Sequence, residues 1–301
     1  MNDKIKECRA EIVEKMIQAM KEGTAPWMRP WSDNDAPRNA ISNRKYNGVN
    51  AFYLGFLGWA KFGGTDPRWA TFAQAQKEGW NIRKGEKGTR VVFWDYLVKP
   101  ELDDNGNPVL DKNGEEKKKS IPFGKVYTVF NATQIAGIPV FTPIVHTFDP
   151  IEKAEKIITD SGAKIKHGGT RAFYSSVTDI VTVPKMEDFN SAYDYYATLL
   201  HELAHWTGHS SRLAREMGRK GSEIYAREEL VAEMASVFLS SETSIPQTPE
   251  HFANHASYVS SWISLLKDDG DALFKAARDA SKASDYILQK NQEVTEDKDA
   301  A

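Results

Sequence analysis

The chain has 301 residues, of which 41% are hydrophobic and 27% charged, so it is long enough to bury one or two hydrophobic cores. Its single cysteine, Cys8, excludes an internal disulfide and a thiolate metal site, which leaves histidine and carboxylate side chains as candidate metal ligands. The longest apolar run, residues 51–62, is shorter than the roughly 20 residues of a membrane-spanning helix. Charged residues interrupt the first twenty positions, so we expect a soluble, cytoplasmic protein without a secretory signal.

The N-terminal half is predicted to combine helices with a long β-ribbon. Apolar residues at helical spacing predict three helices, over residues 5–20, 49–62 and 71–78. Two β-branched and aromatic segments predict strands, over residues 90–98 and 125–130. Turn signals between these strands, at 103–108 and at Asn113-Gly114, indicate a two-stranded ribbon with a polar, charged tip.

The C-terminal half is predicted to be mostly helical and to follow a linker over residues 143–150. Helices are expected over residues 151–161, 191–208, 225–239, 251–267 and 272–290. Two short strands around a polar turn are expected within residues 171–183. The acidic segment 292–301 is expected to be a disordered tail.

The motif with the clearest chemistry is His-Glu-x-x-His at residues 201–205. His201 and His205 lie four residues apart on one helical face, so their imidazoles can bind one ion. In such sites the intervening glutamate, here Glu202, is catalytic, because it takes a proton from a water that the ion acidifies and delivers it to the leaving amine. We expect one divalent transition metal, zinc in the first place and manganese or another ion as the alternative. A motif with only three fixed residues can also occur by chance. A third ligand elsewhere in the chain is therefore needed to support a metal site.

The predicted helix over residues 225–239 supplies carboxylates for that third position. Glu229 and Glu233 lie four residues apart, so both can face the first helix. A buried carboxylate pair among apolar neighbours is costly without a cation. We therefore predict Glu229 as the metal ligand and Glu233 as the carboxylate that orients a ligand imidazole through its free N–H.

Other residues near the motif are alternative candidates for the third position. His209 follows His205 by four residues, but Gly208 is expected to end the helix before it. Glu228 lies about 100° from Glu229 around a helix and is expected to be solvated. Metzincins place a histidine ligand where this chain has Ser211, which argues against that class.

Seven longer segments carry a resemblance to a known family: HELAHWTGHSSRL at 201–213, YAREELVAEMASVFL at 225–239, SYVSSWISLLK at 257–267, PWMRPW at 26–31, NGVNAFYL at 47–54, WNIRKGEKGTRVVFW at 80–94 and VFNATQI at 129–135. Together they resemble the antirestriction protein ArdC family over nearly the full chain, and the Glu-x-x-x-Glu run also looks like the gluzincin arrangement. The resemblance implies an α+β fold: an α/β domain over 1–142 that binds single-stranded DNA, then a mostly helical zincin-like metallopeptidase domain with a small sheet over 151–291. It also implies a plasmid-borne protein that protects incoming conjugative DNA from host restriction.

The N-terminal half can be assessed for DNA binding on physical grounds as well. Residues 1–140 contain 22 Lys and Arg against 17 Asp and Glu, whereas the remainder contains 17 against 25. Binding to single strands needs cations along a backbone path and aromatic faces on which bases stack. The candidate residues are Trp27, Arg29, Trp31, Arg44, Lys45, Tyr46, Trp80, Arg83, Lys84, Lys87 and Arg90. A single tryptophan or tyrosine of this kind is more often part of the core than a DNA contact, and a single lysine or arginine is more often an ordinary surface residue. The occurrence of all of them together favours DNA binding.

Two functions therefore remain open from the sequence. The first is an ArdC-like protein that grips single-stranded DNA, while its metal site either hydrolyses a peptide bond or stabilises the fold. The second is a cytosolic zinc metallopeptidase whose N-terminal domain recognises a protein substrate. A nuclease or primase is less well supported, because the chain lacks a Gly-Lys-Ser/Thr phosphate loop and an obvious acidic cluster for phosphoryl transfer.

Overall fold

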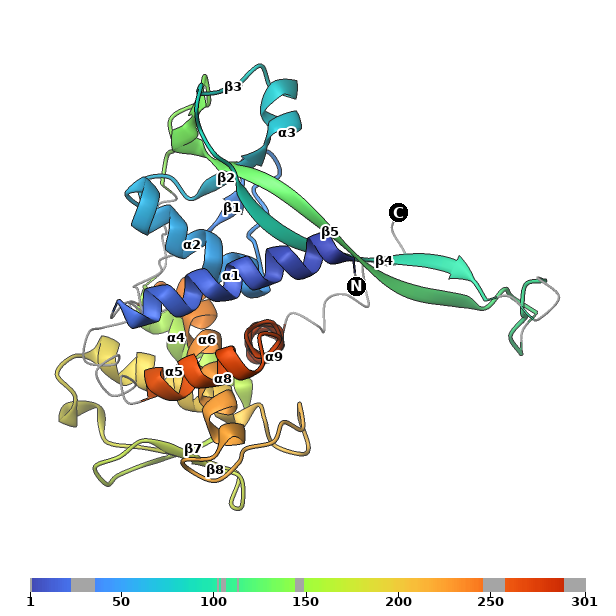
Figure 1. Cartoon of the computed structure of the whole chain (residues 1–301). Coiled ribbons are helices and arrows are strands. Elements are labelled where there is room, and N and C mark those ends of the chain that lie inside the picture. Colours follow the sequence, from blue (N-terminus) through green and yellow to red (C-terminus); the bar gives the residue numbers. More distant parts are fainter. Residues whose placement is uncertain are drawn as a thin grey trace.

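The computed structural model describes residues 2–22, 36–101, 103, 107–112, 114–143, 149–245 and 258–289 (Figure 1). The helices are α1 (Asp3–Lys21), α2 (Gly48–Phe62), α3 (Phe72–Lys77), α4 (Pro150–Ser161), α5 (Ala192–Trp206), α6 (Glu223–Thr243), α8 (Val259–Asp268) and α9 (Ala272–Ile287). The strands are β1 (Arg38–Asn39), β2 (Arg68–Thr71), β3 (Asn81–Ile82), β4 (Thr89–Pro100), β5 (Lys118–Asn131), β6 (Ile135–Ala136), β7 (Lys164–His167), β8 (Phe173–Ser175) and β9 (Ile180–Val183). Two short 3-10 helices, Ala132–Gln134 and Met186–Asp188, complete the described elements.

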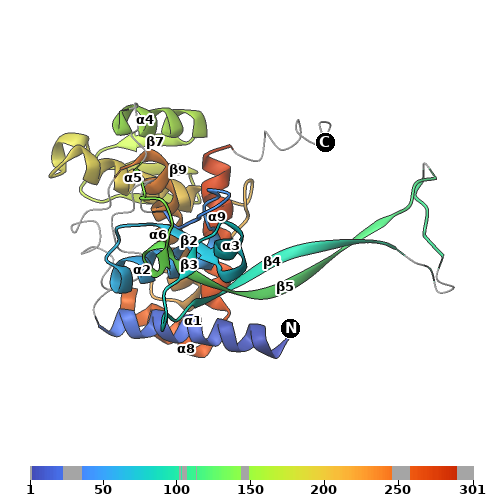
Figure 2. The ribbon, with the colours of Figure 1, turned by 90° about the horizontal axis from the view of Figure 1, so that it is seen from above.

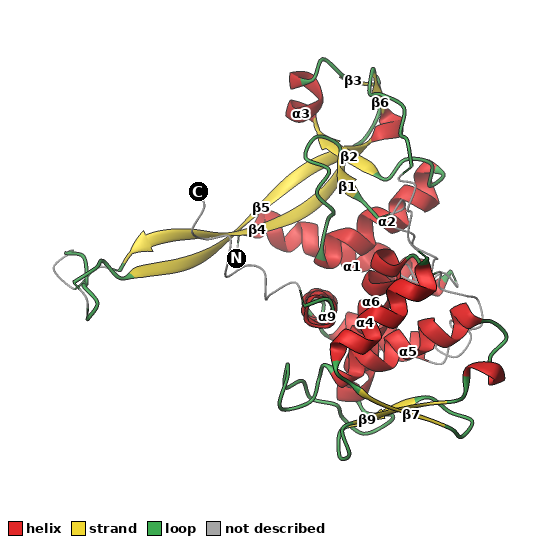
Figure 3. Ribbon diagram, turned by 180° about the vertical axis from the view of Figure 1, so that it is seen from behind, coloured by secondary structure: helices red, strands yellow, loops and turns green. Residues whose placement is uncertain are grey.

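The N-terminal half is built around a four-stranded sheet in the order β1-β2-β5-β4. Its strands β5 and β4 form the predicted ribbon, an antiparallel ladder that runs from Thr89 opposite Val129 to Pro100 opposite Lys118. Near its base the ribbon packs against α1, and the rest of it projects away from the body (Figure 3). β3 pairs with β6 in a separate two-stranded sheet.

The C-terminal half places α5 and α6 side by side, with a small sheet next to α5. That sheet has the order β7-β9-β8, so β8 is an edge strand. Ser191 begins α5 by accepting a hydrogen bond from the backbone N–H of Asp194, and Ser222 begins α6 by accepting one from that of Tyr225. These caps fix where each helix starts, and the apolar faces of the two helices then bury against each other.

The largest hydrophobic core joins the two halves of the chain. Apolar positions of α1 at helical spacing, such as Ile12 and Met16, are fully buried. They belong to the same cluster as Phe52 of α2, Leu230 of α6 and Trp262 of α8. Because this core is shared, residues 1–142 cut from the rest of the chain would expose the apolar face of α1, and binding experiments require the full chain.

Several sequence predictions fall at the edges of the described residues. The helix predicted over 251–267 is seen from Val259, and residues 251–257 lie outside the described part of the chain. The tail 292–301 also lies outside it, as do residues 144–148 of the predicted linker. Among the described helices, none is both long and apolar enough to cross a membrane.

Candidate metal centre

The His-Glu-x-x-His segment lies in the C-terminal half of α5, and nearly every side chain around it is buried. Leu199 and Leu203 anchor the helix in a core cluster with the small sheet. This leaves His201 and His205 on the face toward α6, with ring centroids 4.9 Å apart. Only 3% of His201 and 9% of His205 is exposed, so the histidine pair is positioned by the core.

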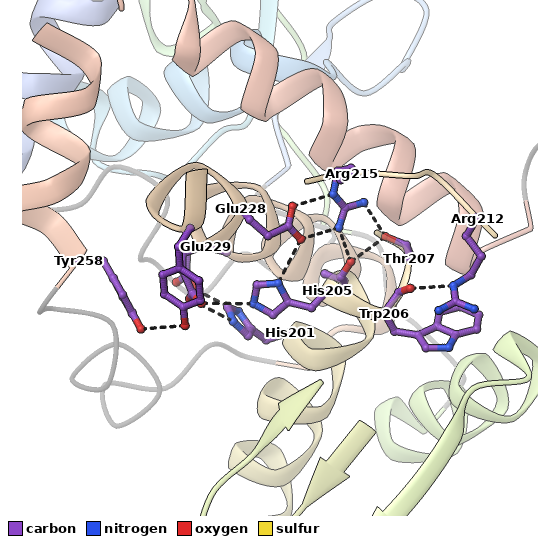
Figure 4. Close-up of polar contacts among 12 residues, drawn as sticks. His201, His205, Trp206, Thr207, Arg212, Arg215, Glu228, Glu229 and Tyr258 are labelled. Atoms are coloured by element: carbon purple, nitrogen blue, oxygen red, sulfur yellow. Dashed lines mark hydrogen bonds and ion pairs between the residues drawn. The ribbon is translucent and has the colours of Figure 1, made fainter. Parts of the chain in front are cut away.

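Glu229 of α6 faces both imidazoles (Figure 4). One carboxylate oxygen lies 3.9 Å from Nε2 of His201 and the other 3.6 Å from Nε2 of His205. The candidate ligand atoms of the three residues all lie within 4.8 Å of one another. Two nitrogens and one oxygen converging in this way are a donor set that suits zinc or a similar divalent ion.

Each histidine also contacts a second buried carboxylate through its other ring nitrogen. Nδ1 of His201 is 3.4 Å from Oε2 of Glu233, which is completely buried. Nδ1 of His205 is 3.1 Å from Oε1 of Glu228. A hydrogen bond from Nδ1–H to a carboxylate, as between His205 and Glu228, fixes the tautomer and ring orientation of a metal-binding histidine and leaves Nε2 free for the ion.

The expectation that Glu228 is solvated is wrong. Glu228 is 3% exposed and accepts hydrogen bonds from Nε and Nη2 of Arg215, at 2.9 and 2.8 Å. Arg215 lies in the irregular segment between α5 and α6, and its charge compensates the buried carboxylate. Burial opposes ionisation of Glu228, but the hydrogen bonds from Arg215 and His205 outweigh it and lower its pKa.

Arg215 also closes the C-terminal end of α5. Nη2 donates to the carbonyl of Ala204 at 2.7 Å, and Nη1 donates to Oγ1 of Thr207 at 2.8 Å. Gly208 suits this turn, because a Cβ at that position would lie 3.0 Å from Nη2 of Arg215 and 3.1 Å from the carbonyl oxygen of His205. Arg215 thereby ties the end of the histidine helix to Glu228 on α6.

The electrostatics of the cluster favour a cation. Burial alone would lower the pKa of His205, but the hydrogen bond with Glu228 and the charges of Glu229, Glu228 and Glu202 raise it to about 9. The site therefore stabilises positive charge where Nε2 of both histidines meets Glu229. A divalent ion supplies that charge, so the residues present fit a metal.

Glu202 lies beside the cluster and has an altered acidity. Its pKa is raised to about 7, mainly by burial and further by the charge of Glu229, while the charge of His205 and a backbone hydrogen bond from Tyr174 lower it. Tyr174 belongs to the edge strand β8. A carboxylate with this acidity can accept and release a proton near neutral pH.

A tyrosine pair that the sequence analysis did not single out lies on the α6 side of the cluster. Tyr225 precedes Glu229 by one helical turn, and its hydroxyl is 3.2 Å from that of Tyr258. Burial, followed by a hydrogen bond with Glu229, raises the pKa of Tyr225. The four-residue spacing of Tyr225 and Glu229 in the sequence indicates that the two side chains share a helical face. Tyr258 comes from a distant segment, and no sequence pattern indicates that it lies here.

The alternative ligand His209 is not part of the cluster. α5 ends at Trp206, and Nδ1 of His209 lies 2.7 Å from Oγ of Ser211 and accepts the backbone N–H of the same residue. The turn therefore directs His209 toward Ser211 and away from Glu229.

We expect replacement of Glu228 with glutamine to weaken metal binding about 10- to 100-fold, the usual effect of losing a carboxylate that supports a ligand histidine. The amide keeps the shape but loses the charge that orients His205. Glu223→Gln is the matched control, because Glu223 lies on the same helix and its side chain is 69% exposed. Competition with a chromophoric zinc chelator measures both variants, and equal affinities would refute this role for Glu228.

The predicted DNA-binding residues are only partly available at the surface. Trp27, Arg29 and Trp31 lie outside the described residues. Tyr46 and Trp80 are half-buried and pack against separate core clusters.

Two of the predicted cations are paired with acidic residues from distant segments. Arg90 contacts Glu7 and Glu11 of α1, at 3.8 and 3.5 Å, and Lys45 contacts Glu242 of α6 at 3.0 Å. The remaining predicted cations, Arg44, Arg83, Lys84 and Lys87, are exposed.

Comparison with known proteins gives a match to each half of the chain. Residues 6–130 match the model of the N-terminal domain of anti-restriction factor ArdC, and residues 152–279 match the model of a zincin-like metallopeptidase. Crystal structures of the ArdC antirestriction protein from plasmid R388, metal-free and bound to Mn(II), superpose with a TM-score of 0.74 each. They are 34% and 33% identical to this chain, cover 93% of it, and are themselves covered over 96% and 97% of their lengths.

Curated relatives extend the comparison. Two DNA primases TraC of Escherichia coli are 43% and 42% identical over 92% of this chain, but the chain spans only 19% and 27% of their lengths. An uncharacterized protein of Sinorhizobium fredii is 33% identical over 92% of this chain and 90% of its own length. These matches confirm the predicted α+β fold, in which a domain of the ArdC N-terminal type precedes a zincin-like one.

Proposed function

Because the chain belongs to the ArdC antirestriction family, we propose that it binds single-stranded DNA through its N-terminal half, carries a divalent metal in its C-terminal half, and protects incoming plasmid DNA from restriction in the cytoplasm. The observation that carries the metal assignment is the convergence of His201, His205 and Glu229 within 4.8 Å. Zinc is the ion we propose, since two imidazoles and one carboxylate leave a fourth position open.

The proposed peptidase chemistry follows from the residues around the ion. A zinc ion supplies Lewis acidity, which lowers the pKa of a water molecule and polarises a carbonyl group. Glu202 would accept the proton that a water molecule loses as its oxygen adds to the peptide carbonyl, and would return this proton to the amine that leaves when the C–N bond breaks. Glu233 and Glu228 hold the two imidazoles so that both present Nε2 to the ion.

The proposed DNA contact requires cations that are free to meet phosphates. Lys84 and Lys87 are exposed between β3 and β4 and form no ion pair within the described residues, and Arg83 and Arg44 are exposed as well. Arg90 contributes less, because Glu7 and Glu11 already offset its charge.

We expect the full-length protein to bind single-stranded DNA more tightly than a duplex of the same sequence. Its affinity should fall steeply as salt rises, because phosphate contacts release counterions, with a slope of about 0.7 per contact in a plot of log affinity against log salt. Fluorescence anisotropy with labelled oligonucleotides measures both quantities.

The same measurement separates the proposal from its alternative, a metallopeptidase whose N-terminal domain recognises a protein substrate. That alternative predicts equal, weak binding of single strands and duplex. Lys84→Gln with Lys87→Gln should reduce the salt slope, whereas Lys164→Gln with Lys166→Gln, on exposed positions of β7, should leave it unchanged.

A further inference from the structure

The outer part of the β4–β5 ribbon, residues 93–100 and 118–125, forms an arm that leaves the body of the protein (Figure 2). At the base of the ribbon, Val92 is buried in the shared core, and Val91 and Val129 are buried in a second cluster. Among the described residues, none of the arm belongs to a hydrophobic cluster. A two-stranded ribbon without support from a hydrophobic core is only marginally stable in water. We therefore asked which function could account for the side chains of the arm.

The two faces of the arm differ near the body, whereas farther out both expose apolar side chains, with Val98 58% exposed on the first face. Residues directly opposite each other share a face, and successive pairs alternate between faces. On one face Trp94 lies opposite Gly124, where a Cβ would be 2.9 Å from Cδ1 of Ile5 and 3.1 Å from the Trp94 ring. α1 and the indole therefore cover this face near the body.

The opposite face exposes apolar side chains that belong to none of the hydrophobic clusters of the described residues. Phe93, Leu97 and Ile121 of the arm, and Tyr127 next to the arm on the same face, are each between 40% and 49% exposed. The rings of Phe93 and Tyr127 meet edge to face, with centroids 6.1 Å apart. Two aromatic rings are thus held in place while part of their surface remains open to a planar partner.

Lysines without an ion pair to any described side chain are interleaved with these rings on the same face. Lys125 lies opposite Phe93, with Nζ 5.4 Å from the centroid of Phe123. Lys99 and Lys119 lie directly opposite each other, an arrangement that destabilises a ribbon unless an anion lies between the ammonium groups. No ion pair to these three lysines is present among the described residues.

Charge along the ribbon limits where an anion can bind. Residues 89–101 and 117–131 contain six Lys and Arg against two Asp and Glu, in a chain whose net charge is −3. The segment 102–116 at the tip contains one lysine against five acidic residues. We therefore expect a polyanion to bind along the two strands of the ribbon but not at its acidic tip.

We propose that this face of the arm, together with the adjoining Tyr127, is a binding surface for single-stranded nucleic acid, with bases stacking on Phe93 and Tyr127 and phosphates meeting Lys99, Lys119 and Lys125. The proposal rests on the proposed function and adds a surface that the sequence analysis did not include. Exposed rings interleaved with exposed ammonium groups match the requirements of sequence-tolerant single-strand binding. A protein partner would need acidic side chains at the same spacing to neutralise the opposed lysines.

The test uses full-length protein and a fluorescein-labelled oligothymidylate in anisotropy titrations. Replacing Lys99, Lys119 and Lys125 with glutamine should lower the salt slope by about 2, at about 0.7 per lost contact. Phe93→Ser with Tyr127→Ser should weaken binding at least about fivefold, the loss expected when stacking of one base is removed. The control carries the same charge change at exposed lysines elsewhere, Lys164→Gln, Lys166→Gln and Lys220→Gln, and should bind like the unmodified protein.

The outcomes separate this inference from the proposed function. If arm variants bind like the unmodified protein while Lys84→Gln with Lys87→Gln weakens binding, the arm proposal is overturned and DNA binding stands. If the unmodified protein does not bind the oligonucleotide, both fail. If arm variants lose only duplex binding, the claim for single strands is wrong.

A second measurement does not depend on substitutions. Photocross-linking of the unmodified protein to an oligonucleotide that contains 4-thiothymidine should label peptides that contain Phe93 or Tyr127. Labelling confined to other peptides would contradict the proposal.

Discussion

Replacing His201 and His205 together with alanine should reduce the metal content from about one ion per chain to nearly none. The double variant retains only Glu229 of the three convergent residues, and one carboxylate cannot hold a transition metal at that position against water. Elemental analysis of the folded, gel-filtered protein gives the result. His167→Ala with His209→Ala is the matched control, because both histidines lie outside the cluster, and it should retain the metal.

Thermal unfolding gives an independent measure of the same prediction. A ligand that binds only the folded state stabilises it by about 4 kcal/mol at a thousandfold excess over its dissociation constant. A chelator should therefore lower the Tm of the unmodified protein and leave that of the double variant unchanged. Glu229→Gln, a gentler change, should lose most of the metal as well. Full metal content in the double variant would show that the assignment is wrong.

Replacing Glu202 with glutamine should abolish any peptidase activity, with a loss of about 10²- to 10⁴-fold, while the metal and the fold are retained. The substitution removes a proton acceptor but none of the three convergent ligand atoms. Cleavage of a peptide library, followed by mass spectrometry, measures the activity, and elemental analysis measures the metal. Loss of metal in this variant would mean that Glu202 is a ligand.

DNA binding by the Glu202→Gln variant should equal that of the unmodified protein, because the proposed DNA residues lie before residue 140 and the metal residues after residue 200. The structure makes this a demanding test, since α6 carries Glu229 and also contributes Leu230 to the core that it shares with α1 and α2. Loss of DNA binding would show that the two sites are coupled through this core.

The central part of the candidate site could be predicted because its signals are local. Helical spacing places His201 beside His205 and Glu229 in line with Glu233, and one buried face on each helix is enough to bring the two pairs together. Glu228 was misjudged for the opposite reason. The partner of Glu228, Arg215, comes from an irregular segment whose sequence has no periodicity. The angle between Glu228 and Glu229 around α6 therefore does not indicate that Glu228 is buried.

The N-terminal surface shows a second limit of sequence reasoning. Cations can be counted in a sequence, but Arg90 meets Glu7 and Glu11, and Lys45 meets Glu242, only after folding. The predicted ribbon is present and longer than its two β-rich segments suggested, whereas short strands such as β1 and β3 have too few residues to show a period. Acidic residues far away in the sequence determine which of these cations form ion pairs and which remain available to DNA.

The most direct test of the account is restriction protection by the Glu202→Gln variant in cells. Transfer of an unmodified conjugative plasmid into a restricting recipient is compared for recipients that make the unmodified protein, the variant, or neither. We predict that the variant protects as well as the unmodified protein, because shielding DNA requires only occupancy of the strand. Loss of protection in a variant that still binds metal and single-stranded DNA would contradict the account and make cleavage part of the protective mechanism.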